Sequence, residues 1–210
     1  MVQEGIEIGR LLRSGITGFV AGCRVSQLEV PSFGSLVRAP LGERYQIYGL
    51  IYDIHVDDDG LVRQLVTADN VDDEVIEDNR LNRNVPMEMS VMAIGHHDGD
   101  QVRHLMPPRP ALSLDVIYLC GPKELVEFTS TGQFGYFRHI LRNKDLPISE
   151  ILAAHIHQAN EAQAAAGNTT WLRDASKELI TLLRDDYQTL MTVLGALSDA
   201  VPEIQASRRE

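Results

Sequence analysis

Carboxylates are the most concentrated reactive groups in this sequence. Ten acidic residues lie between positions 53 and 78, where Arg63 is the single lysine or arginine. Hard cations such as Mg²⁺ and Ca²⁺ need several oxygen ligands at one point, but DDDG at 57–60 matches only the start of a calcium-binding loop. Asp and Gly between two strand-like runs also form ordinary hairpin turns. We favour a solvated turn and helix over a metal site, with an acidic docking surface for a basic partner as a further alternative. The ten residues are Asp53, Asp57, Asp58, Asp59, Asp69, Asp72, Asp73, Glu74, Glu77 and Asp78.

The seven histidines are the next candidates for catalysis or metal binding. His96 and His97 are neighbours at the end of a strand-like run, where consecutive side chains point to opposite faces and do not easily share an ion. His155 and His157 also diverge, because a shared metal on a helix needs the i, i+4 spacing of HExxH. We therefore predict no metal ligand among them and interpret His155, on an apolar helix stripe, as a core or interface residue.

Motifs for nucleotide binding and nucleophilic catalysis are missing from the sequence. A phosphate-binding loop needs GxxxxGK[ST], yet the first lysine is Lys123 and no glycine-rich loop precedes it in that spacing. Neither GxGxxG after a strand nor GxSxG occurs. Cys23 and Cys120 lack zinc or redox spacing, so we expect both to be reduced and buried. The sequence thus predicts no catalytic residue, no cofactor-binding residue, no metal ligand and no cofactor.

Residues 134–144, FGYFRHILRNK, combine aromatic and basic side chains, a mixture that can stack on a nucleic acid strand. On a helix the same mixture is more often a core face with a charged rim. The net charge of −11 also disfavours binding to a phosphate backbone, whose affinity comes from Lys and Arg. We favour the core interpretation for the six side chains, Phe134, Tyr136, Phe137, Arg138, Arg142 and Lys144.

The overall composition is that of a globular protein, with 44% hydrophobic and 23% charged residues in 210. Residues 1–20 carry early acids and several glycines and do not match a signal peptide. No run approaches the roughly 18 apolar residues that a membrane span requires. We therefore expect a cytoplasmic protein with no membrane partner.

Short extended runs separated by turn residues predict a barrel or sandwich in the first half of the chain. The clearest pair of strands lies within 31–54, where Gly49 indicates a bulge, a barrel corner or a close backbone approach. A short helix is expected within 69–83, because acids lie in its first turns and arginines follow. The predicted strands are 7–12, 18–25, 36–39, 46–54, 61–67, 85–94 and 101–105.

The hydrophobic period changes after the prolines at 107–110. One more strand is expected at 114–120, then short helices at 122–129 and 134–143, and then two long helices joined by a loop at Gly167. The predicted fold class is α+β. A small closed N-terminal β-barrel (1–106) is followed by a C-terminal α-helical domain (111–203) with a long antiparallel helix pair, and by a frayed tail (204–210).

Four patterns in the first half resemble the HAS barrel, the N-terminal β-barrel of HerA-type DNA translocases and of ATP synthase catalytic subunits. They are GRL at 9–11, FVA at 19–21, GSLV at 34–37 and GLIYDI at 49–54. The resemblance implies a barrel that stands beside others in a ring on a hexameric motor and offers docking surface to partners such as a NurA-type nuclease. In HerA-type proteins the barrel leads into an ATPase core, whereas here a helical region without a phosphate loop follows, so no catalytic residue carries over.

The leading hypothesis is a non-enzymatic assembly or docking module, a stand-alone HAS-like barrel that forms a homo-oligomer or binds a HerA-type ATPase and nuclease system in DNA processing. The alternative is a metal-dependent nuclease or other hydrolase that uses the acidic residues of 53–78 to position cations. Direct single-strand binding by the barrel face is a third and weaker hypothesis, because the acidic charge balance opposes it.

Overall fold

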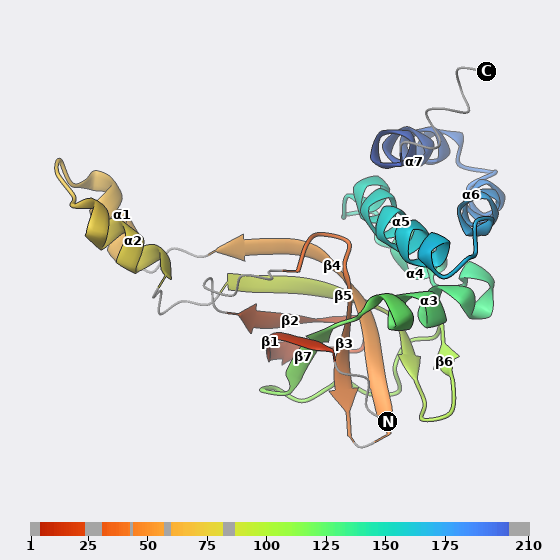
Figure 1. Ribbon diagram of the computed structural model, residues 1–210, viewed down its shortest axis with the longest axis horizontal. Coiled ribbons are helices and arrows are strands. Elements are labelled where there is room, and N and C mark those ends of the chain that lie inside the picture. Colours follow the sequence, from red (N-terminus) through yellow and green to blue (C-terminus); the bar gives the residue numbers. More distant parts are fainter. Residues whose placement is uncertain (1–4, 24–30, 43, 57–59, 82–86, 202–210) are drawn as a thin grey trace.

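Six antiparallel strands close into a barrel in the computed structural model, which describes residues 5–23, 31–42, 44–56, 60–81 and 87–201 (Figure 1). The order around the ring is β1–β2–β5–β4–β3–β7 and back to β1. The strands are β1 (Ile6–Ser14), β2 (Gly18–Cys23), β3 (Leu36–Leu41), β4 (Tyr45–Val56), β5 (Met87–His97) and β7 (Val116–Leu119). Closure pairs both edges of every strand in the ring, which removes the exposed edges of an open sheet.

Five of the predicted strands, 7–12, 18–25, 36–39, 46–54 and 85–94, are confirmed within the described residues as β1 to β5. The strand expected at 101–105 is reduced to β6 (Val102–Arg103), which pairs with the end of β5 outside the ring. Residues 24–25 and 85–86 of the predicted strands lie outside the described part of the chain.

Residues 47–51 of β4 and most of β5 are buried on both faces, which explains their apolar sequences. Ile47 and Ile51 of β4 belong to the core inside the barrel, whereas Tyr48 and Leu50 belong to a second core between the barrel and the helices. Gly49 lies at a β-bulge, and a Cβ there would be 2.4 Å from Cγ1 of Val91. The close backbone approach predicted at Gly49 is therefore confirmed.

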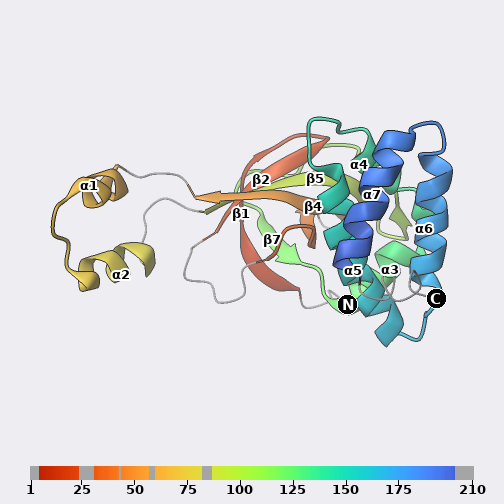
Figure 2. The ribbon, with the colours of Figure 1, turned by 90° about the horizontal axis from the view of Figure 1, so that it is seen from above.

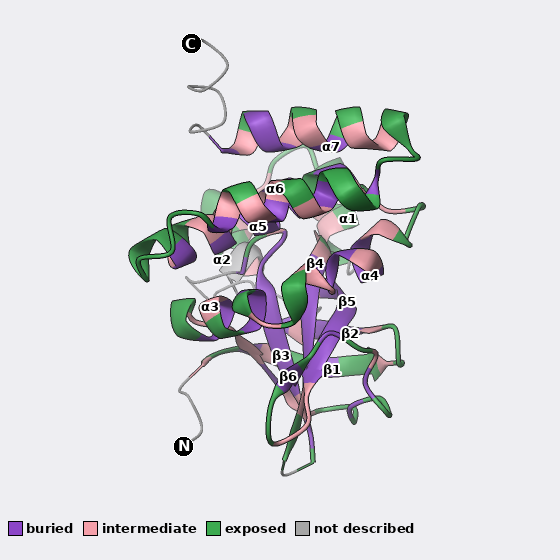
Figure 3. Cartoon of the chain, turned by 90° about the vertical axis from the view of Figure 1, so that its right-hand side faces the viewer, coloured by how far each residue is buried: buried purple, intermediate pink, exposed green. Residues whose placement is uncertain are grey.

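Helices cover the outer face of β3, β4 and β5 and share the second core with them (Figure 3). The helix α5 buries one stripe against this core, as predicted, with Ile151, Leu152 and Ile156 fully buried. The layer consists of α3 (Pro122–Ser130), η1 (Gly132–Phe134), α4 (Phe137–Leu141), α5 (Ile148–Ala165), α6 (Trp171–Leu182) and α7 (Tyr187–Ala200). A closed barrel followed by helices confirms the α+β class.

The second of the two predicted long helices is divided into α6 and α7, and α7 lies back on α5. The division occurs at residues 183–186, where Asp186 caps the N-terminus of α7. Its carboxylate accepts hydrogen bonds from the backbone N of Thr189 at 3.1 Å and from the Thr189 hydroxyl at 2.8 Å. An N-cap aspartate with a partner three residues later is a helix start signal that a purely apolar period does not reveal.

The barrel extends beyond the domain boundary that the prolines at 107–110 predict. Strand β7 follows those prolines, yet it pairs with both β1 and β3 and places Ile117 in the barrel interior. The helices begin at Pro122 and share one hydrophobic core with the outer face of the barrel. The predicted tail, 204–210, lies outside the described residues.

Residues 61–67 form a helix, α1 (Leu61–Thr67), and the predicted strand there is wrong. The sequence signal for a helix is the spacing of four residues between Leu61 and Leu65 and between Val62 and Val66. A helix places side chains at this spacing on one face. The expected second helix is confirmed as α2 (Asp73–Leu81). Together α1 and α2, residues 60–81, form a helical arm that projects beyond the ends of β4 and β5, away from the barrel (Figure 2).

Candidate functional site

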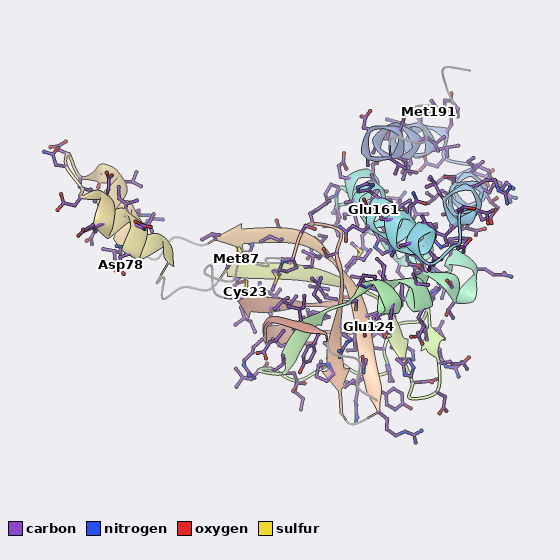
Figure 4. The ribbon with its side chains drawn as sticks, in the orientation of Figure 1. Cys23, Asp78, Met87, Glu124, Glu161 and Met191 are labelled. Carbon is purple, nitrogen blue, oxygen red and sulfur yellow. The ribbon has the colours of Figure 1, made fainter. Side chains whose placement is uncertain are left out.

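The helical arm carries most of the described carboxylates of the acidic segment. Asp69 and Asp72 lie between the two helices, and α2 adds Asp73, Glu74, Glu77 and Asp78. Two acids in the first turn of α2 are favourable for its helix dipole. Figure 4 shows Asp78 on the arm, far from Glu124 at the barrel and α3. The arm is thus a strongly acidic surface carried at a distance from the body of the protein.

The arm also exposes apolar side chains. Val66 is 78% exposed, and Leu61 and Val75 are 46% and 42% exposed. Helix α1 has no buried residue, and none of the described side chains of α2 is buried either. Most of the stability of helices in proteins comes from packing an apolar face. A pair of short helices that buries so little on its own chain is therefore suited to packing against another molecule.

The remaining acids of the segment lie elsewhere. Asp53 is on β4, where its carboxylate is 3.5 Å from Nδ1 of His55. The predicted turn at 57–60 has its three aspartates, 57–59, outside the described residues. Within the part of the chain that the structure describes, no three His, Cys, Asp or Glu side chains are grouped so that they could hold a metal ion. The described carboxylates form a surface rather than a convergent site.

His155 is a core residue, as its position on the apolar stripe predicts. Its Nδ1 donates to the carbonyl of Gly34 at 3.3 Å, so its Nε2 is left to accept from the Tyr136 hydroxyl at 3.2 Å. Burial lowers the pKa of His155 to about 4, and the ring is neutral at pH 7. This polar bridge connects α5 to the chain leading into β3.

Two further buried histidines, His104 and His139, were not singled out by the sequence. His104 donates from Nε2 to the Phe128 carbonyl at 3.1 Å, and burial lowers its pKa to about 4. The carbonyl of His104 accepts from Nε2 of His139 at 3.0 Å and also from Arg138. The three rings of His104, Phe128 and Tyr136 contact one another in the same cluster. The cluster holds the segment after β6 on α3 and α4.

The aromatic residues of 134–144 are structural. Tyr136 and Phe137 are fully buried, and Phe134 packs on Phe137 and Trp171 with ring centroids 5.5 Å and 5.6 Å away. From residue 136 to residue 144, the exposed side chains lie at the end of the segment and include Arg142 and Lys144. These aromatic faces are used inside the protein and are not presented to nucleic acid bases.

The two cysteines are free thiols. Burial raises the pKa of Cys23 and, with help from the nearby Glu124 carboxylate, that of Cys120. A raised pKa disfavours the thiolate, which is the reactive form of cysteine. Neither environment activates a nucleophile.

Among the clefts on the described surface, two lie beside the helical layer. One, of about 340 Å³, lies between the β1–β2 turn and the α4–α5 loop, with Arg13, Thr17 and Asn143 among its lining residues. The other, of about 310 Å³, lies between α3 and α5, with Cys120, Gln158 and Glu161 in its wall. Neither brings a nucleophile into contact with a base, so the helical arm remains the stronger candidate.

The comparisons with known proteins add no family or relative to these observations: neither protein-family models nor curated proteins match the chain. No helix among the described residues is long and apolar enough to cross a membrane.

Proposed function

We propose that this protein is a non-enzymatic assembly module, in which a closed barrel presents docking surface and the helical arm makes contact with another protein. The observation that carries the proposal is the arm itself, which extends from the barrel and exposes Val66, Leu61 and Val75 among carboxylates. Apolar side chains supply the contact energy of protein interfaces, while surrounding charges select the partner and speed encounter.

The resemblance of the first half to the HAS barrel supports a more specific partner. We propose a cytoplasmic role in which the barrel forms an oligomer or docks on a HerA-type motor ATPase, with its NurA-type nuclease, in DNA processing. A closed barrel that takes five of its six strands from the same half of the chain agrees with this proposal. An acidic arm would be attracted to a basic surface on such a partner.

Binding of a HerA-type ATPase to the full chain tests the proposal. The wild-type chain is expected to co-elute with the ATPase in size-exclusion chromatography and to show a saturable binding isotherm. A variant with residues 57–86 replaced by a short glycine-serine linker is expected to lose binding by at least roughly tenfold, because the interface loses its central apolar contacts. A monomeric wild-type chain that neither self-associates nor binds the ATPase would overturn the proposal.

The competing hydrolase hypothesis is separated by a DNA cleavage assay with Mg²⁺ and Mn²⁺, using Asp53→Asn and Asp72→Asn. These two carboxylates lie on different parts of the protein, one on β4 and one before α2. We expect no cleavage by the wild-type chain. Cleavage that both substitutions abolish would favour the enzyme over the assembly module.

A further inference from the structure

We propose that the helical arm of one copy docks on a patch of exposed leucines on the barrel of a second copy. The leucine patch consists of Leu12, Leu112 and Leu114, which are 39%, 72% and 70% exposed. This inference rests on the assembly role proposed above and names the partner of the arm.

Backbone contacts bring the three leucines together. The Leu114 N–H donates to the Leu11 carbonyl at 2.8 Å, and the Ser113 hydroxyl donates to the Leu12 carbonyl at 3.4 Å. The loop before β7 is thereby attached along the end of β1, where a bulge lies between Leu11 and Arg13. Strand β1 is across the ring from β4, so the patch is on a wall that the helical layer does not cover.

Leu114 occupies a backbone conformation that leucine rarely adopts, with φ at 73°. The conformation is held by the hydrogen bond from its own N–H, and by Arg10, which donates from Nη1 to its carbonyl at 3.1 Å. Such strain persists where the surrounding structure enforces it, and it is concentrated at functional positions. An asparagine or aspartate would fit this backbone better, so a leucine here is expected to serve a contact.

Charge complementarity identifies the occupant of the patch. The exposed Arg10 and Arg13 flank Leu12, and the exposed Arg109 is in the same loop as Leu112. Carboxylates accompany these arginines: Glu7 lies 3.7 Å from Arg10, the mostly covered Glu88 lies 3.4 Å from Arg13, and Asp115 accepts from the Leu112 N–H at 3.0 Å. The side chains of Arg10 and Arg13 are nevertheless 58% and 67% exposed, so their guanidinium groups are accessible to an acidic partner.

The arm offers the matching surface on the same chain. Its exposed Leu61, Val66 and Val75 lie among the carboxylates of α2 and the segment before it. On a chain whose net charge is −11, an apolar patch edged by exposed arginines and an acidic apolar arm are complementary surfaces. The arm points away from its own barrel, so a second copy supplies the patch (Figures 1 and 2). Since the two surfaces differ, each added copy leaves one arm and one patch unused, and association continues until a ring closes.

Two variants and their mixture test the interface. The patch variant, Leu112→Asp with Leu114→Asp, adds acids that repel the arm. The arm variant, Val66→Arg with Val75→Arg, adds bases that repel the patch. Neither affects a buried side chain. By light scattering after size exclusion, wild type is expected to be oligomeric, and each variant alone is expected to self-associate at least roughly tenfold more weakly.

An equimolar mixture of the two variants is expected to form a dimer, because the intact arm of one meets the intact patch of the other. The dimer cannot grow, since its remaining arm and patch are both altered. Ile180→Asp, at a 46% exposed position on α6, is the matched control and should keep the wild-type mass. A monomeric wild type, or variants with wild-type mass, would overturn the interface, as would a mixture that stays monomeric.

Leu114→Asn separates docking from folding, because it removes the apolar contact and relieves the backbone strain. We expect a higher melting temperature together with weaker self-association. If Leu114→Asn leaves self-association unchanged, Leu114 is not part of the interface. If the patch and arm variants by themselves keep the oligomeric mass of the wild type but no longer bind the HerA-type ATPase, this inference is contradicted. The proposed function would then stay in place.

Discussion

Arg38 on β3 and Glu124 on α3 form a buried ion pair between the barrel and the helical layer. Nε of Arg38 lies 2.8 Å from Oε1 of Glu124, and the side chains are only 5% and 8% exposed. The guanidinium also lies over the Tyr118 ring of β7, 4.5 Å from its centroid. The other carboxylate oxygen accepts from the N–H of Gly121 at 3.3 Å, which caps α3. One charge pair thus connects β3, the end of the closing strand β7 and the first helix after it.

Breaking this pair should be costly. We expect Arg38→Met to lower the free energy of unfolding by about 3–5 kcal/mol, because Glu124 is left as an uncompensated buried charge. The double variant Arg38→Met with Glu124→Leu should recover most of the loss. Urea denaturation measures both.

The exposed pair of Arg44 and Asp100 is the matched control for the buried one. Its side chains are 71% and 81% exposed, with the charges 3.5 Å apart. Arg44→Met should change the free energy of unfolding by less than about 1 kcal/mol. Equal effects of Arg38→Met and Arg44→Met would show that burial of the pair does not matter.

Stability should fall as the pH is lowered from about 6.5 to about 4. Burial lowers the pKa of His104 and of His155 to about 4, against 6.5 for an ordinary histidine. In this window the unfolded chain binds protons that the folded protein does not, so the stability present above pH 6.5 is lost on acidification. Each of the two histidine rings changes the free energy of unfolding by up to about 1.4 kcal/mol per pH unit in this window.

His155→Gln tests this pH dependence, with His157→Gln as its control. His157 is on the same helix, with a half-exposed side chain 3.7 Å from Glu161. Unfolding free energies measured from pH 7.5 to 4.5 should show a shallower slope for His155→Gln than for His157→Gln, which keeps the buried ring. A wild-type slope in both variants would exclude His155 as a source of the effect.

Gly49→Ala should destabilise the barrel by about 1–3 kcal/mol, because overpacking forces shifts in the surrounding structure. The added Cβ would lie 2.4 Å from Cγ1 of Val91 and 2.7 Å from the Met92 carbonyl oxygen. Gly195→Ala in α7, where the new methyl meets nothing within 4 Å, should instead stabilise the protein by about 0.5–1 kcal/mol. Thermal melts of both variants with the same sign of change would contradict this difference.

Asp186→Ala should cost about 1 kcal/mol, because α7 loses the side chain that caps it. The preceding Asp185 is 91% exposed and lies 3.3 Å from Nε of its neighbour Arg184, so Asp185→Ala is the control. Chemical denaturation should show the loss for position 186 alone. If both substitutions cost the same, the effect comes from the local charge rather than from the cap.

The sequence predicts the elements whose patterns are local. Short extended runs between turn residues in β1 to β5, Pro122 at the first position of α3, and the apolar stripe of α5 are each expressed within one segment, and the structure confirms them. Helix α1 was missed because Leu and Val suit strands as well as helices, and only the spacing of four separates them.

Features that depend on distant residues were not predictable from one sequence. Nothing local in Val116–Leu119 shows that β7 closes the ring between β1 and β3. Arg38 and Glu124 are far apart in the chain, and arginine and glutamate are residue types that usually lie on the protein surface. For the candidate site, the acids of the arm were identified, but the arm's projection and its exposed apolar side chains follow only from the three-dimensional arrangement.

The late position of β7 has a consequence for biosynthesis. A nascent chain that has left the ribosome only as far as residue 110 contains β1 and β3 but not the strand that lies between them. Until residue 119 has left the ribosome, both of those strand edges keep unpaired backbone groups, and such edges favour aggregation. The protein therefore completes its barrel only after more than half of it has been synthesised.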